Sequence, residues 1–192
     1  MHRVVVAIAI VVVGFASRDA AAEVGDDEPG AYLAVDYGVT VRRIADPATR
    51  PTALARGSGP VTDARGASTA VSFLQRFALA LSRHIYLGSE VEVTYDGDED
   101  RSPERPRMAS GAQLVAGVMA SSHALELGAE VTGGWRVMYH APDHAVFEAR
   151  VHGELWLAPH LTLGVAVGTS IVERGDGVAA LYIGLHTREF GE

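Results

Sequence analysis

The chain has 192 residues, a formal net charge of −8 and no cysteine. This length fits one domain, and the absence of cysteine excludes disulfides and thiolate chemistry. An acidic chain without a basic patch is not expected to bind nucleic acid.

The first 22 residues are expected to be a secretion signal. Residues 1–3 are a short basic start, residues 4–16 are an apolar run, and residues 20–22 are alanines that suit a cleavage site. The apolar run is shorter than the roughly 20 residues that a membrane-spanning helix needs. The acidic residues 23–30 that follow are expected to form a disordered N-terminus of the mature chain, and no cysteine is present there for a lipid anchor.

Residues 31–192 contain eight segments that alternate between an apolar face and a face of small and charged residues. Such alternation is typical of strands, because successive side chains of a strand point to opposite sides. The clearest segment is 124–139, in which Leu127 and Val131 alternate with Glu126 and Glu130. In chain order the segments cover residues 31–42, 67–81, 84–95, 110–120, 124–139, 145–157, 161–171 and 178–188.

The connections between these segments differ in length by parity. Those after the first and third segments are long and polar, residues 43–66 and 96–107, whereas those after the second, fourth and sixth have two or three residues. An outer-membrane barrel with periplasmic termini has long loops outside and short turns inside. An even number of strands also allows the sheet to close, which removes both exposed edges.

The small residues of the second face indicate that this face lines a confined interior. Glycine, alanine, serine and threonine suit the lumen of an eight-stranded barrel, which side chains just fill. The middle of the apolar face carries no charge in any segment, and a charge there would cost about 2–4 kcal/mol in a bilayer. The alternative is a soluble periplasmic, lipocalin-like barrel with its apolar face around a ligand. We predict an all-β fold, an eight-stranded antiparallel up-and-down transmembrane β-barrel.

Charged residues of both signs occupy the predicted interior face. An unpaired buried ion costs several kcal/mol, so these charges must pair. We predict a salt-bridge network that plugs the lumen, and the alternative is a narrow gated pore whose pairs exchange partners. The predicted network comprises Asp36, Arg42, Arg76, Glu90, Glu92, Glu126, Glu130, Arg136, Glu148, Arg150, Glu154 and Arg188.

Aromatic residues of the apolar face lie near the segment ends that lead into the long loops. Aromatic belts at the membrane–water interface have this placement. The predicted girdle comprises Phe73, Tyr95, Trp135, Tyr139 and Phe147.

The signal sequence, the eight amphipathic segments and the loop parity together resemble the small OmpA/OmpX-type outer-membrane β-barrel superfamily, over about residues 30–190. Such proteins often end in an aromatic residue in phase with the outward positions. Phe190 departs from that pattern, because it is two residues from the end of the sequence and out of phase with Leu181, Ile183 and Leu185. We expect a monomer in the outer membrane of a Gram-negative bacterium, in contact with outer-membrane lipid and lipopolysaccharide. Its expected role is structural or surface interaction, with any extracellular partner bound through loops 43–66 and 96–107.

Eight-stranded barrels include enzymes that modify lipid A, and this is the alternative function. The deacylase type resembles a His-x-Ser pair on the lipid side, whereas this chain has His152-Gly153-Glu154 with His152 on the lumen face. The acyltransferase type needs a histidine and a serine near the outer rim, and His140, His144 and Ser102 do not form a convincing pair of this kind. We therefore expect no catalytic residue and no cofactor.

Three short motifs are interpreted as ordinary loop chemistry. His140 and His144, with Asp143, could bind a divalent metal, but loop histidines are usually solvated, so no metal site is predicted. The tripeptide 174–176 (Arg-Gly-Asp) is expected at an exposed loop tip, where it is either an integrin-type motif or a plain turn. The acidic residues 96–100 could hold Ca²⁺ loosely, although a solvated loop is expected.

Overall fold

The computed structural model describes residues 32–46, 66–95, 107–122, 124–139 and 141–187. The expected signal sequence, the segment 23–30 and most of loops 43–66 and 96–107 lie outside these residues. Within the described residues no helix has the length and apolar character needed to cross a membrane.

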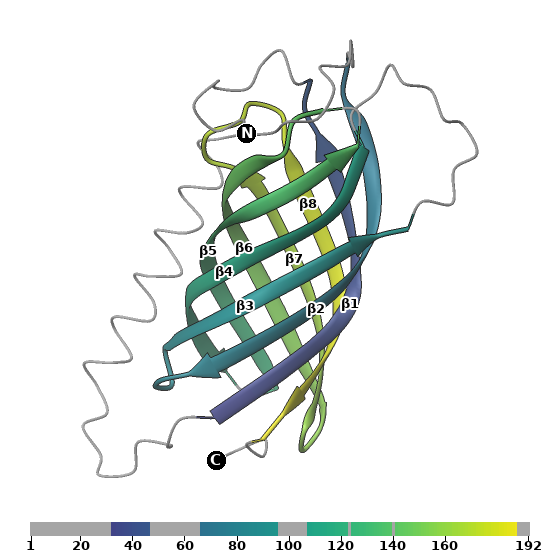
Figure 1. Ribbon diagram of the computed structural model, residues 1–192. Coiled ribbons are helices and arrows are strands. Elements are labelled where there is room, and N and C mark those ends of the chain that lie inside the picture. Colours follow the sequence, from purple (N-terminus) through teal and green to yellow (C-terminus); the bar gives the residue numbers. More distant parts are fainter. Residues whose placement is uncertain (1–31, 47–65, 96–106, 123, 140, 188–192) are drawn as a thin grey trace.

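Eight strands form one closed antiparallel sheet in which each strand pairs with its neighbours in chain order (Figure 1). The last strand pairs with the first, with Ile183 opposite Tyr37, and this pairing closes the barrel. The predicted fold class is therefore confirmed. The strands are β1 Tyr32–Ile44, β2 Ser68–Ala80, β3 Ile85–Thr94, β4 Arg107–Ser122, β5 Leu125–Tyr139, β6 His144–Ala158, β7 Leu161–Ser170 and β8 Gly177–His186.

Burial alternates along the strands with the predicted period of two. In β5, Glu126, Glu130 and Arg136 are buried in the lumen. Leu127 and Val131, on the opposite face, are 47% and 54% exposed. The apolar face is therefore the exterior, the reverse of what a soluble barrel with an apolar lumen requires.

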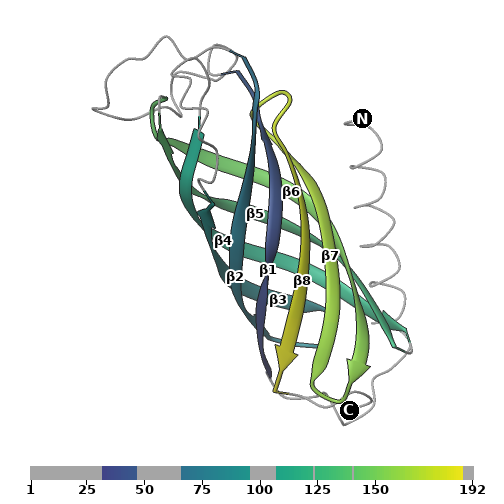
Figure 2. The same ribbon diagram turned by 90° about the vertical axis from the view of Figure 1, so that its right-hand side faces the viewer.

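The two ends of the barrel are different. The strand ends that the β1–β2, β3–β4, β5–β6 and β7–β8 connections join lie at one end of the barrel, here called the loop end (Figures 1 and 2). The short β2–β3, β4–β5 and β6–β7 connections lie at the other, the turn end, together with the start of β1 and the end of β8. The parity predicted for the connections is thus the parity of the structure.

β4 is longer than expected, and it carries large apolar side chains inward. Its pairing with β5 shifts between Met108 and Ser110, where a bulge interrupts the register. Val115 and Met119 pack inside against Tyr32, Ala80 and Tyr86 toward the turn end. A second buried cluster, toward the loop end, joins Ile44, Ala70, Met108 and Met138.

Candidate functional site in the barrel lumen

Four arginines project into the lumen from four different strands. Arg42 of β1, Arg76 of β2, Arg136 of β5 and Arg150 of β6 are each no more than 2% exposed. Each lies at an inward position of its strand, so the alternation that places apolar residues against lipid also places these guanidiniums inside. Burial of this kind requires a partner for every charge.

Arg42 makes a bidentate pair with Glu92. Its Nε and Nη2 atoms donate to the two Glu92 carboxylate oxygens at 2.6 and 2.5 Å. Its Nη1 donates to Glu148 at 2.6 Å, and Thr40 donates its hydroxyl to Glu92 at 3.2 Å. The planar guanidinium thereby joins two carboxylates from two other strands, which a lysine ammonium would not do with fixed geometry.

Arg150 connects opposite sides of the lumen. Its Nη1 and Nη2 atoms donate to Glu90 at 2.8 and 2.9 Å, although β6 and β3 are not neighbours in the sheet. It also donates to Glu148 at 2.7 Å and lies 3.5 Å from Glu130. Arg76 in turn donates to Glu90 at 3.1 Å and to Glu130 at 2.9 Å. These contacts make the central lumen one continuous hydrogen-bonded network.

A small cavity lined by both polar and apolar side chains lies between this network and the turn end. It measures about 30 Å³, enough for a water molecule, and its lining includes Asp36, Tyr86, His152, Glu154 and His186. Tyr86 donates to Glu130 at 2.6 Å and lies 3.0 Å from His152 Nε2. Oδ1 of Asp36 and the Nδ1 atoms of both histidines have no hydrogen-bond partner within the described part of the chain. Ordered water would satisfy such groups.

At the loop end the network reaches the β7–β8 connection. Arg136 donates to Asp176 at 2.9 Å and to Glu148 at 3.0 Å. The backbone N–H of Ala45 also donates to Asp176. Burial disfavours the charged form of Asp176, but hydrogen bonds with Glu173 and Ala45 and the charge of Arg136 outweigh it and hold the pKa of that carboxyl below its ordinary value.

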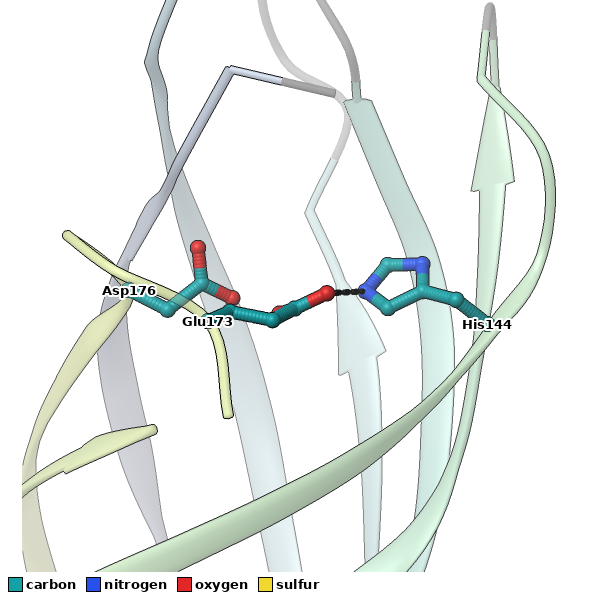
Figure 3. Close-up of side chains that lie close together, drawn as sticks. All are labelled: His144, Glu173 and Asp176. Carbon is teal, nitrogen blue, oxygen red and sulfur yellow. Dashed lines mark ion pairs between the residues drawn. The ribbon is translucent and has the colours of Figure 1, made fainter. Parts of the chain in front are cut away.

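His144 and Glu173 meet beside this carboxylate. Both side chains are fully shielded from solvent, and His144 Nε2 lies 3.6 Å from Glu173 Oε1 (Figure 3). His144 begins β6, whereas Glu173 comes from the β7–β8 connection. That connection turns inward because the backbone N–H groups of Val172 and Glu173 both donate to the Ser170 hydroxyl.

Eleven of the twelve residues predicted for the lumen network lie in the described part of the chain, and all eleven are buried. Arg188 lies outside the described residues. Asp36 is at the edge of the network, 4.0 Å from Arg76, and Glu126 accepts a hydrogen bond from Ser121 at 2.9 Å near the turn end. Sequence reasoning missed Asp176, because it lies in a turn to which the period of two does not apply.

The five residues predicted for the girdle are all on the exterior. Exposure ranges from 38% at Trp135 to 79% at Tyr95, which directly follows β3. Tyr37, which was not counted in the girdle, is also on the exterior: it is 43% exposed, and its ring centroid lies 6.4 Å from that of Phe73.

Two expectations about loop residues are wrong. His144 is not a solvated loop histidine, because β6 begins one residue earlier than predicted and directs this side chain inward. Asp176 is not displayed at a loop tip, because Arg136 and Ala45 hold it in the lumen at 2% exposure. Asp143 accepts a hydrogen bond from the backbone of Met138, whereas His140, Ser102 and residues 96–100 lie outside the described residues.

No protein-family model and no curated protein matches this chain. Solved structures do. A de novo designed transmembrane β-barrel superposes with a TM-score of 0.50 at 14% identity, over 85% of this chain and 100% of the designed one. Neisserial surface protein A gives 0.50 at 9% identity, over 85% and 99%. Ail, the attachment invasion locus protein of Yersinia pestis, gives 0.49 at 9% identity, over 82% and 99%.

Identities this low show the fold alone. The chain has the closed, antiparallel, eight-stranded fold of small outer-membrane barrels.

Proposed function

We propose that this chain is a monomeric outer-membrane protein of a Gram-negative bacterium, without enzymatic activity, whose role is structural or one of surface interaction. In this proposal residues 1–22 direct secretion, residues 23–30 begin the mature chain, and residues 31–192 form the barrel. One observation carries the proposal: an apolar exterior surrounds a lumen filled with arginine–carboxylate pairs.

The exterior supports a membrane location. Apolar side chains such as Val165 and Leu181 are each about half exposed, and every strand contributes to this surface. Soluble monomers rarely expose contiguous apolar patches larger than a few hundred Å². Contact with outer-membrane lipid and lipopolysaccharide would cover this apolar exterior surface.

The lumen supports a role outside the barrel rather than through it. Its centre is occupied by hydrogen-bonded ion pairs, and buried apolar clusters lie on either side along the axis. An eight-stranded barrel is just wide enough for its own side chains. The chemistry left for a partner is therefore in the loop-end segments 43–66 and 96–107, through which we propose that the protein binds it.

Lipid A modification receives no support from the candidate histidines. His152 lies in the lumen beside Tyr86 and Glu154, away from the lipid-facing surface. Lipid A from a deletion strain, analysed by mass spectrometry, is expected to equal that of the parent strain, and a changed acylation pattern would contradict the proposal.

Labelling of single cysteines tests location and orientation together, because the chain has no cysteine of its own. The variants Ser58→Cys and Ser102→Cys, in the β1–β2 and β3–β4 connections, are expected to react in intact cells with a maleimide that does not cross membranes. Ser82→Cys, in the β2–β3 connection at the turn end, is the matched control and should react only after lysis. Labelling of position 82 but not of 58 or 102 in intact cells would contradict the proposed orientation. Recovery of the protein in soluble form without detergent would contradict the proposed membrane location.

A further inference from the structure

His144, Glu173 and Asp176 form a compact group of metal-binding side chains at the loop end of the lumen. One ligand atom from each lies within 4.8 Å of the other two, and all three residues are buried. We propose that this group binds a divalent transition-metal ion of the zinc class. The site is separate from the surface role proposed above.

The spacing of the ligand atoms suits a metal better than a direct hydrogen bond. Nε2 of His144 is 3.6 Å from Oε1 of Glu173, and Figure 3 shows that carboxylate directed at the imidazole. A separation of 3.6 Å is too long for a side-chain hydrogen bond. Two tetrahedral ligands, each about 2.0–2.1 Å from zinc, are about 3.4 Å apart.

The other nitrogen of the imidazole supports the same assignment. Nδ1 of His144 lies 3.3 Å from the carbonyl oxygen of Pro142, which can only accept a hydrogen bond. Nδ1 therefore carries a proton, and in the neutral ring Nε2 directs its lone pair at the Glu173 carboxylate. Histidines that bind metals through one nitrogen almost always donate the other N–H to a carbonyl or carboxylate in this way.

The two carboxylates are also held in place. Ser170 fixes the turn that carries Glu173, through hydrogen bonds from the backbone N–H groups of Val172 and Glu173. Asp176 accepts from Ala45 and Arg136 and has a hydrogen bond with Glu173, and since each carboxylate oxygen has two lone pairs, lone pairs remain for a metal. Ligating carboxylates usually have such outer hydrogen bonds.

The charge of the lumen favours an added cation. Arg136 is the arginine in contact with Asp176, and it also serves Glu148. Within the described part of the chain, buried carboxylates outnumber buried arginines by nine to four. The carboxylates are Asp36, Glu90, Glu92, Glu126, Glu130, Glu148, Glu154, Glu173 and Asp176, and the arginines are Arg42, Arg76, Arg136 and Arg150.

The donor set selects the class of ion. An imidazole nitrogen suits zinc and other later transition metals, whereas Ca²⁺ takes six to eight oxygen ligands. Three protein ligands leave a fourth position for water. A bound ion would tie the β7–β8 connection to the first residue of β6, across the loop end of the lumen.

Calorimetry of metal binding is the direct test. Protein refolded in detergent micelles and stripped with EDTA is titrated with Zn²⁺ and is expected to bind one equivalent. His144→Gln and Glu173→Gln should each weaken this binding at least tenfold, because each removes one ligand while nearly keeping the side-chain volume. His160→Gln, at an exposed histidine of the β6–β7 turn, is the matched control and should bind as wild type.

Folding of each variant is checked by heat-modifiable mobility on gels. The wild type also gives an answer without substitution: zinc should shift the ¹⁵N resonance of His144 Nε2 while Nδ1 keeps its proton. The proposal would be overturned if the wild type bound no saturable equivalent of Zn²⁺, if both glutamine variants bound Zn²⁺ as tightly as the wild type, or if the His144 resonance did not move. Each of these results would leave a simple ion pair between His144 and Glu173.

Discussion

At the scale of single residues, the lumen depends on arginine as a fork that joins several carboxylates. Arg150 donates to Glu90 through two nitrogens and to Glu148 through two. Each buried ion loses several kcal/mol of hydration, which its partners must offset. The chain contains no lysine, and a single ammonium would not serve two carboxylates with comparable geometry.

Removing one arginine should therefore lower the stability of the barrel by more than the loss of that arginine's hydrogen bonds, because its carboxylate partners remain buried. Arg150→Met is expected to lower the free energy of unfolding by about 3–5 kcal/mol, because Glu90, Glu130 and Glu148 would stay buried with less compensation. Urea titration of the protein folded in lipid vesicles measures this. Arg174→Met, at an exposed position, is the control and should change stability by no more than about 0.5 kcal/mol. Equal stability of the two variants would mean that the network contributes nothing to the fold.

Glycine at inward positions leaves room for large polar side chains. A Cβ at Gly164 would overlap the ring of Tyr182, and one at Gly128 would overlap the imidazole of His152. Tyr182 donates to Glu154 at 3.1 Å, so its ring is not free to move aside. The small residues of the inner face thus provide the space that its large polar side chains occupy.

At the scale of the strand, the alternation assigns every residue to lipid or lumen. Shifting a strand by one position would turn Glu130 outward and Val131 inward, so the pattern also fixes the register. Because the outward side chains contact lipid, the free-energy cost of placing a charge at an outward position depends on the depth of that position in the bilayer.

Val131→Arg, near the middle of β5, is expected to lower the free energy of unfolding in vesicles by about 2–4 kcal/mol. Val41→Arg, near the loop end of β1 and beside the exposed Arg43, is the matched control and should cost about 0–1 kcal/mol. Similar costs at the two positions would argue against a hydrocarbon layer centred on the strands.

The strands were predictable because lipid and lumen impose the same period of two on all eight. The connection between β7 and β8 was not, since its inward course depends on Ser170, and on Arg136 from a distant strand. His144 lies at the boundary between a predictable strand and a connection that was not predictable. It shares the inward phase of Glu148 and Arg150, so starting the predicted strand one residue earlier would have placed it in the lumen.

The pairs within the lumen were also beyond prediction. Parity assigns Glu90 and Arg150 to the inner face, but their contact depends on the stagger of β3 relative to β6, two strands that share no backbone hydrogen bonds. Composition therefore predicts a network, whereas the partners follow from the closed barrel.

At the scale of the whole molecule, the lumen is layered along the barrel axis. An apolar cluster that includes Met108 and Ile44 lies toward the loop end, and the cluster that includes Tyr86 and Met119 lies toward the turn end. The ion pairs lie between them, beside a third buried cluster of Leu74, Ala166 and Tyr182. An ion crossing the barrel would have to pass both clusters and displace the pairs between them.

Purified protein in planar bilayers is accordingly expected to show no steady conductance. Separating a buried pair such as Arg42 and Glu92 costs several kcal/mol, and a permeating ion would have to disturb several such pairs in succession. A large water-filled porin added to the same bilayer is the control and should give clear single-channel steps. Steady steps from the eight-stranded protein alone would contradict the plug and show that its pairs exchange partners in a narrow gated pore.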